Sequence, residues 1–193
     1  MRHARIIVTH YGGPDTLQVI KEECPVPQPG EVRVKVLAAG VSLPDVLSAR
    51  GHPSGNTSRP LHTRLGSDRR CRSGHGVSDF ELGQMLAAMP ISGCYAQYVC
   101  LPQRKFIPVP AGLDPAEAVA VVLNYITAYQ MLHRSAKVEQ GQRALIHGAS
   151  GGVGSALLQL GRLAGVEMYG TCSAQAAATV KSTETRSGAV RDC

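Results

Sequence analysis

The chain has 193 residues, 44% of them hydrophobic and 18% charged, a composition that excludes fibrous and largely disordered proteins. Its mean hydropathy is −0.04, and no apolar run approaches the roughly 18 residues that a membrane-spanning helix needs. The first residues lack the apolar core and the cleavage site of a signal peptide. We therefore expect a cytoplasmic protein that does not enter membranes.

The net charge of +6 is concentrated between residues 50 and 75. That segment contains one acid, Asp68, and six arginines: Arg50, Arg59, Arg64, Arg69, Arg70 and Arg72. It has no Phe, Tyr or Trp and little periodicity, whereas a nucleic-acid site usually places basic charge on an ordered face beside stacking aromatics. We expect a solvated basic loop and no nucleic-acid partner.

Alternating apolar residues predict β-strands through the first third of the chain. We expect strands at 6–8 and 17–21 around a turn at Gly12–Asp15. A proline-rich linker then leads to Val32–Val36, where valines alternate with basic residues as in a half-buried strand. A short helix is expected to begin near Pro44, because proline is tolerated in the first helical turn.

Residues 51–75 break this pattern, since they contain no Val, Ile or Phe. We expect these residues to pack poorly. We hypothesise that they are encoded by the nucleotides that encode this segment in family members, read in another frame. Beyond them, the pattern predicts strands at 85–89 and 95–101 and helices at 115–123 and 126–136.

A glycine-rich turn is the most informative stretch. A short strand at Arg143–His147, expected to be buried, runs into the turn at Gly148–Gly154. A helix follows, and Gly165 is a plausible stop before a second strand at 166–171. One face of that helix carries Val153, Ala156, Leu157, Leu160 and Ala164. The pattern is that of a strand-helix-strand unit with a parallel sheet.

The turn matches the dinucleotide-binding fingerprint as Ala149-x-Gly151-x-x-Gly154, with Ala in place of the first glycine. Without a Cβ, Gly151 lets a pyrophosphate approach the backbone, and Gly154 lets the helix pack tightly on the strand. The helix amino terminus offers free N–H groups to the anion. The predicted cofactor-binding residues are Ala149, Ser150, Gly151, Gly152, Val153 and Gly154.

A P-loop and a glycine-rich turn without a ligand are the two alternatives to a dinucleotide site. A P-loop needs Lys and then Ser or Thr after its last glycine, but Ser155 and Ala156 follow Gly154. A glycine-rich turn that binds nothing stays open. NAD sites usually carry an acid at the end of the second strand. Here the second strand ends without an acid. The Ser173 hydroxyl suits a 2′-phosphate, and Lys181 is nearby in sequence. NADP is therefore favoured over NAD.

Over about residues 4–49 and 76–175 the chain resembles the medium-chain dehydrogenase/reductase superfamily, on its zinc-independent quinone oxidoreductase (zeta-crystallin-like) branch. The motifs that carry the resemblance are Tyr11–Pro14, Glu31–Val36, Ala39–Asp45, Gly93–Tyr98, Asn124–Tyr129 and His147–Gly154. The resemblance implies an α+β fold, in which a GroES-like β-rich domain (1–123) precedes the start of an α/β Rossmann domain (124–193). The substrate would lie in the cleft between them.

The same resemblance implies NADPH-dependent hydride transfer to a quinone or an activated alkene, a small-molecule substrate. Thr127 would lie near the nicotinamide, and Ser42 and Asp45 near the mouth of the cleft, although a loop-capping pair is an equally good interpretation of these two. Zinc-dependent relatives carry a Cys where this chain has Ser42, so no metal is expected. We expect His52, His62 and His75 to be solvated loop residues.

Family members continue for well over a hundred residues beyond this strand-helix-strand unit, and full-length relatives are expected to be homo-oligomers. We therefore expect a truncated oxidoreductase with impaired activity. The alternative is a non-catalytic truncated isoform or pseudogene product that acts as a binding protein.

Overall fold

The computed structural model describes residues 1–51, 64–66, 80–81, 83–90, 93–182 and 186–187. These residues belong to two compact units, Met1–Val122 and Leu123–Cys193. Most of the basic segment 51–75 lies outside the described residues, as do His52, His62 and His75. Its expected loose packing and the reading-frame hypothesis therefore stay predictions.

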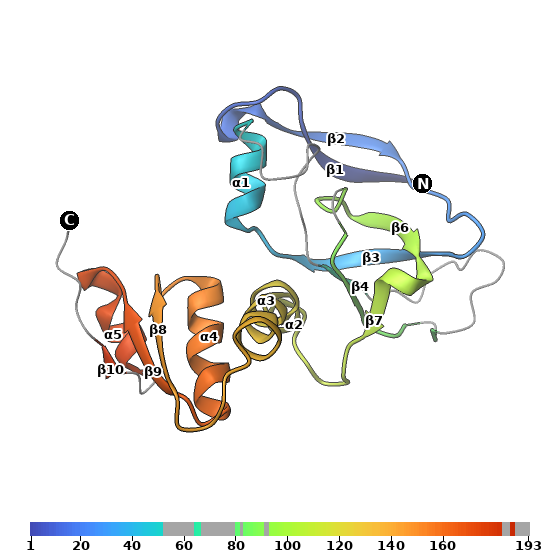
Figure 1. Cartoon of the computed structure of the whole chain (residues 1–193). Coiled ribbons are helices and arrows are strands. Elements are labelled where there is room, and N and C mark those ends of the chain that lie inside the picture. The colour runs from blue at the N-terminus through green and yellow to red at the C-terminus, as the bar shows by residue number, and fades with distance from the viewer. Residues whose placement is uncertain (52–63, 67–79, 82, 91–92, 183–185, 188–193) are drawn as a thin grey trace. The chain divides into compact units, whose positions relative to one another are not determined.

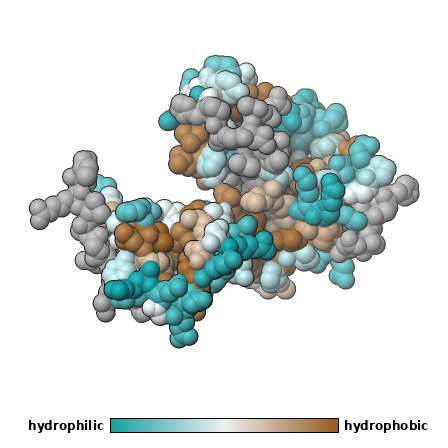
Figure 2. Space-filling model, in the orientation of Figure 1, coloured by the Kyte–Doolittle hydropathy of each residue, from teal (hydrophilic) through white to brown (hydrophobic). Residues whose placement is uncertain are grey.

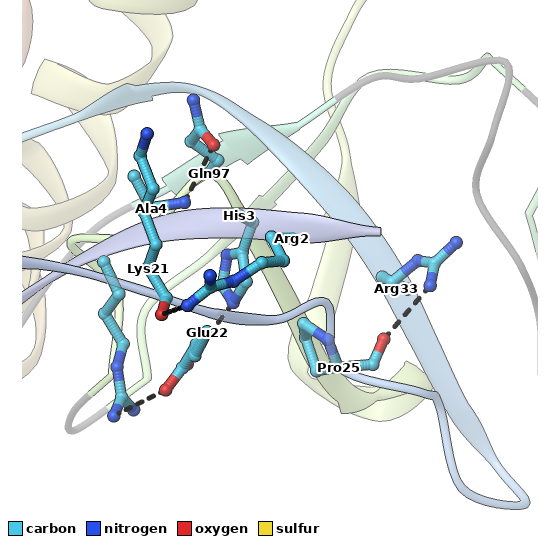
Figure 3. A network of polar contacts seen from close by, with 9 residues as sticks. Arg2, His3, Ala4, Lys21, Glu22, Pro25, Arg33 and Gln97 are labelled. Atoms are coloured by element: carbon cyan, nitrogen blue, oxygen red, sulfur yellow. Dashed lines mark hydrogen bonds and ion pairs between the residues drawn. The ribbon is translucent and has the colours of Figure 1, made fainter.

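The first unit begins with an antiparallel hairpin of β1 (Arg2–Val8) and β2 (Leu17–Glu23). The 3-10 turn η1 (Pro14–Thr16) joins the two strands, where the sequence predicts a turn. Figure 3 shows the polar contacts on this hairpin: Glu22 lies 3.3 Å from His3 Nε2 and 3.1 Å from an Arg5 guanidinium nitrogen. The Ala4 amide donates to Gln97 Oε1 over 2.9 Å, which ties the hairpin to a distant segment.

An antiparallel sheet with the order β6-β3-β4-β5-β7 forms the body of this unit (Figure 1). Its strands are β6 (Tyr98–Pro102), β3 (Glu31–Ala39), β4 (Arg64–Gly66), β5 (Leu86–Ala88) and β7 (Phe106–Pro108). β3, β5 and β6 fall where the alternating pattern predicts strands. β4 lies inside the basic segment, where no strand is predicted from the sequence, and it pairs with both β3 and β5.

Both faces of β5 are buried, because its residues alternate between two apolar clusters. Leu86 and Ala88 belong to the first cluster, with Val32, Val34, Val99 and Phe106. Ala87 belongs to the second, with Ala118, Val119 and Val122. The second cluster brings in α2 (Pro115–Ala120), which begins at Asp114, whose carboxylate accepts the amide of Ala116 at 2.8 Å. The helix α1 (Leu43–Ala49) begins next to Pro44, as predicted.

The chain passes into the second unit through a helical stretch with irregular turns. The π-helical turns η3 (Val121–Tyr125) and η4 (Gln130–Ala136) flank α3 (Ile126–Tyr129). Lys137 ends the stretch in the left-handed conformation, with φ of 49°. The sequence predicts a helix over 126–136, and the structure has one whose hydrogen bonding alternates between α and π.

A parallel sheet with the order β10-β9-β8 follows. In chain order the elements are β8 (Arg143–His147), α4 (Gly152–Leu163), β9 (Glu167–Thr171), η5 (Ala174–Ala176), α5 (Ala177–Ser182) and β10 (Arg186–Ser187). α4 and α5 contribute Leu158 and Val180 to one apolar cluster with Met168 of β9, so both helices cover the same face of the sheet.

The opposite face of this sheet corrects one expectation. The sequence predicts that β8 is a buried strand, but only Ala144 and Ile146 pack into the clusters, while Leu145 is 57% exposed. The reason is that α4 and α5 lie on one face, and among the described residues no element covers the other. The alternation of exposed and half-buried residues along β8 is that of a strand covered on one side.

The fold class is as predicted: a GroES-like β-rich unit is followed by the start of a Rossmann unit. Cys24, Cys100 and Cys172 are free thiols in the described part of the chain, Cys94 is buried, and burial raises the pKa of Cys100 to about 11. No helix among the described residues is long and apolar enough to cross a membrane.

Candidate functional site

In the glycine-rich turn between β8 and α4 the backbone changes direction at a glycine with positive φ. After His147, Gly148 adopts a φ of +67°, a conformation that side chains disfavour. Ala149 is buried, and its N–H donates to the carbonyl of Thr171 at 2.9 Å. The turn is thus fixed to the carboxyl ends of both β8 and β9, which is where open parallel sheets bind ligands.

Two glycines of this turn are required for different reasons. A Cβ on Gly154 would collide with the carbonyl oxygen of Gly148 and lie 2.8 Å from the Cα of Ala149, so Gly154 lets α4 pack against the turn. A Cβ on Gly151 would meet, among the described residues within 4 Å, a single atom, the Gly148 carbonyl oxygen at 3.3 Å. Gly151 is also exposed. Close packing therefore accounts for Gly154, and at Gly151 it amounts to one tight contact with a backbone oxygen.

The amino end of α4 is open to a ligand. Gly151 is its N-cap, and no side chain within the described ranges hydrogen-bonds to this end of the helix. The Ser155 hydroxyl is instead engaged with the Ala149 carbonyl at 3.3 Å. Ser150 is exposed. Val153 is half-buried and packs against the apolar cluster that contains Ala156 and Leu157 of α4. The predicted set from Ala149 to Gly154 therefore forms one continuous loop around the free N–H groups of the helix.

One residue at this turn was not singled out from the sequence. A Cβ on Gly152 would lie 2.6 Å from Nδ2 of Asn124 and 3.0 Å from its Cγ, so the Asn124 side chain rests on the first residue of α4. Asn124 belongs to a family motif, but no periodicity or spacing in the sequence connects it with the glycine turn. It is brought there by the π-helical turn η3.

The other predicted cofactor residues lie outside this loop in the sequence. Thr127 is half-buried on α3. Ser173 follows β9, is exposed, and caps η5 through its carbonyl, which accepts the Ala176 amide at 3.0 Å. The Ser173 hydroxyl makes no capping bond with the described residues. The side chain of Lys181 lies outside the described residues.

Ser42 and Asp45 form a capping box at the start of α1. Oδ2 of Asp45 accepts the Ser42 amide at 2.7 Å and the Ser42 hydroxyl at 2.6 Å. Asp45 is only 4% exposed, which is unusual for an acid in a capping box. The loop-capping interpretation thus describes the observed geometry, while a role in substrate binding stays a prediction.

Burial dominates the electrostatics around Asp45. It raises the pKa of this carboxyl, and hydrogen bonds from Ser42 and Tyr95 oppose the shift. The pKa of the Tyr95 phenol is raised too, by burial and by the Asp45 charge. The Tyr95 hydroxyl also lies 3.4 Å from the carbonyl of Gly40, in the loop before α1.

Apolar side chains surround this polar group on the surface. Val41 is 72% exposed and Leu43 is 69% exposed, and Val46 adds to the same patch one helical turn further on. Figure 2 shows the apolar surface gathered over α1. The Ser42 hydroxyl therefore lies at the edge of a surface that suits an apolar ligand.

Metal ligands are not grouped in the described part of the chain: no three His, Cys, Asp or Glu side chains come together there. The Ser42 hydroxyl is directed to Asp45.

Comparison with known proteins places this architecture in a class. No protein-family model matches the chain. It is 30% identical over 174 residues to the human synaptic vesicle membrane protein VAT-1 homolog-like, covering 87% of this chain and 41% of that protein. The crystal structure of the human protein superposes with a TM-score of 0.89 at 27% identity, covering 100% of this chain and 62% of that chain.

Two further solved structures share the fold. The CurK enoyl reductase has a TM-score of 0.85 at 25% identity, and the match covers 97% of this chain and 59% of that one. A mycobacterial protein complexed with NADPH has a TM-score of 0.85 at 26% identity, with 99% and 60% covered. The chain therefore spans about three-fifths of the length of these structures.

These structures share the β-rich first unit and, in the second unit, the strand, glycine turn and helix of β8 and α4. The chain belongs to the medium-chain dehydrogenase/reductase superfamily, and it is similar there to VAT-1 homologues and enoyl reductases.

Proposed function

We propose that the glycine turn binds NADPH and that the chain is an oxidoreductase of the quinone oxidoreductase or enoyl reductase type. The observation that carries the proposal is Gly151, an exposed glycine at the N-cap of α4 whose Cβ position meets one atom among the described residues, the Gly148 carbonyl oxygen at 3.3 Å. The solvent side of this glycine is therefore open to a ligand that approaches the backbone, and a pyrophosphate on the free N–H groups is such a ligand.

The preference for NADPH rests on the end of β9. The strand ends at Thr171 and is followed by Cys172 and Ser173, with no acid to hold a ribose 2′-hydroxyl. The exposed Ser173 hydroxyl makes no capping bond with the described residues, and we propose that it donates to the 2′-phosphate. A structural relative that holds NADPH supports this cofactor.

The proposed acceptor is a quinone or an activated alkene. When bound, NADPH supplies a hydride from nicotinamide C4, and the chain's own residues bind and orient the two reactants. Support for an apolar acceptor comes from Val41 and Leu43 beside the Ser42 hydroxyl. Since the Ser42 hydroxyl is already directed to Asp45, we propose a reaction without zinc. We also propose a cytoplasmic location.

The test is a fluorescence titration of the purified chain with NADPH, in parallel with Gly151→Val. The valine side chain would occupy the phosphate's space without removing charge, so we expect binding to be lost. Gly40→Val is the matched control, because a Cβ there meets nothing within 4 Å and Gly40 lies outside the turn. Thermal unfolding of each variant checks that the fold is intact.

Equal NADPH affinity of the wild type and Gly151→Val would show that the turn is only a connection between strand and helix. Wild-type chain that does not bind NADPH would overturn the proposed function.

A further inference from the structure

We infer that Asn124 forms a second wall of the dinucleotide site, and that its carboxamide donates a hydrogen bond to the pyrophosphate held at the amino end of α4. This inference rests on the proposed function and extends it, because it adds a side chain to a site otherwise made of backbone groups.

The first observation is the position of the Asn124 side chain. Gly152 is the first residue of α4 and follows the N-cap Gly151 directly. Gly152 is exposed to solvent, yet a Cβ on it would lie 2.6 Å from Nδ2 of Asn124 and 3.0 Å from its Cγ and Oδ1, too close for a side chain there unless the carboxamide moves. Glycine at 152 thus allows the carboxamide to lie against the helix end where the anion is expected.

The second observation is that the Asn124 position is fixed from several sides. The next residue, Tyr125, donates its hydroxyl to Gln159 Oε1 of α4 at 2.8 Å. One turn further on, Ala128 of α3 and Ala156 of α4 are both fully buried in one cluster. Two alanines at this contact let the helices approach closely. The π-helical turn η3 therefore presents Asn124 to the glycine turn as part of a packed structure.

The third observation concerns hydrogen bonding. Asn124 is half-buried, but its carboxamide has no hydrogen-bond partner among the residues that the structure describes. A carboxamide carries two donors and one acceptor, and a partly desolvated amide without partners loses stabilisation. A donor beside a helix amino terminus has the right polarity for a phosphate oxygen. A bound pyrophosphate would satisfy the amide.

Equilibrium titration with NADPH tests the inference on the whole chain. Asn124→Ala should weaken NADPH binding about tenfold or more, the loss expected for one hydrogen bond to a charged group. Asn124→Asp has nearly the same shape but sets a carboxylate against the pyrophosphate, and it should weaken binding further. Gln130→Ala, an exposed residue on the same helical stretch, is the matched control and should bind like the wild type.

A ligand-free measurement checks the contact itself. Gly152→Ala should lower the midpoint of thermal unfolding, because the new methyl group meets the Asn124 carboxamide. The double variant Asn124→Ala, Gly152→Ala should recover much of that loss. If the wild type binds NADPH and both Asn124 variants bind it equally well, the inference is wrong and the proposed function stands. If the wild type fails to bind NADPH, the proposed function and this inference fall together.

Discussion

Asp45 receives two hydrogen bonds from the same residue, since Ser42 donates both its amide, at 2.7 Å, and its hydroxyl, at 2.6 Å, to Oδ2. The pair closes the amino end of α1 while holding a carboxyl group almost out of contact with water. An acid that is buried in this way costs stability when it ionises.

The consequence is a pH dependence of folding. Burial holds the pKa of Asp45 above its ordinary value of 3.8, so between that value and the raised one the folded chain binds more protons than the unfolded chain. The Asp45 contribution to stability must then fall as the pH rises through this window. Asp45→Asn cannot ionise, and it should gain stability relative to the wild type as the pH rises from about 4 through the raised pKa of Asp45.

Urea unfolding of both proteins at several pH values measures this difference. Because the other titrating groups are shared, the difference between the two curves isolates Asp45. A difference that stays constant over the whole range would contradict the prediction.

Cofactor selectivity should depend on Ser173. Ser173→Asp places a carboxylate where the 2′-phosphate of NADPH is proposed to lie, and we expect NADPH affinity to fall about tenfold or more through charge repulsion. NADH, which has a hydroxyl in place of that phosphate, should lose far less. Fluorescence titrations with the two cofactors provide the comparison, and Ser173→Ala is the control for the missing hydroxyl. A loss of equal size for both cofactors would place the 2′-phosphate elsewhere.

The packing of α4 on β9 should depend on Gly161. A Cβ at this buried glycine would collide with Sδ of Met168 and lie 2.7 Å from its Cε. Gly161→Ala should therefore lower the free energy of unfolding by about 1–3 kcal/mol, the usual cost of overpacking a core. Chemical denaturation measures it. Met168→Ala should cost less in the Gly161→Ala background than in the wild type, and additive effects would rule out the direct contact.

The glycine turn and its helix could be predicted because their signals are local. Glycines at 151 and 154 and apolar residues such as Ala156 and Leu157 follow one another at helical spacing, and the structure buries both apolar residues. The valines of β3 likewise alternate with polar residues because one side of that strand faces an apolar cluster.

What could not be predicted depends on distant parts of the chain. Leu145 looks buried within its apolar strand, but its exposure depends on which face α4 and α5 cover. β4 has no alternating pattern and becomes a strand by pairing with β3 and β5. Asn124 reaches Gly152 through π-helical turns, which shift the side chains away from the positions that a regular helix would give them.

The two units differ in how far apart along the chain their contacting residues lie, and this difference bears on the order in which they fold. The bond from the Ala4 amide to Gln97 joins residues 93 apart, whereas the contact between His147 and Thr171 joins residues 24 apart. Closing a longer loop costs more chain entropy, and folds rich in distant pairings form more slowly. On a ribosome, β1 would emerge long before the segment around Gln97 with which it pairs, while β8 and β9 could pair soon after they appear. The second unit would then complete its strand pairing sooner after synthesis than the first.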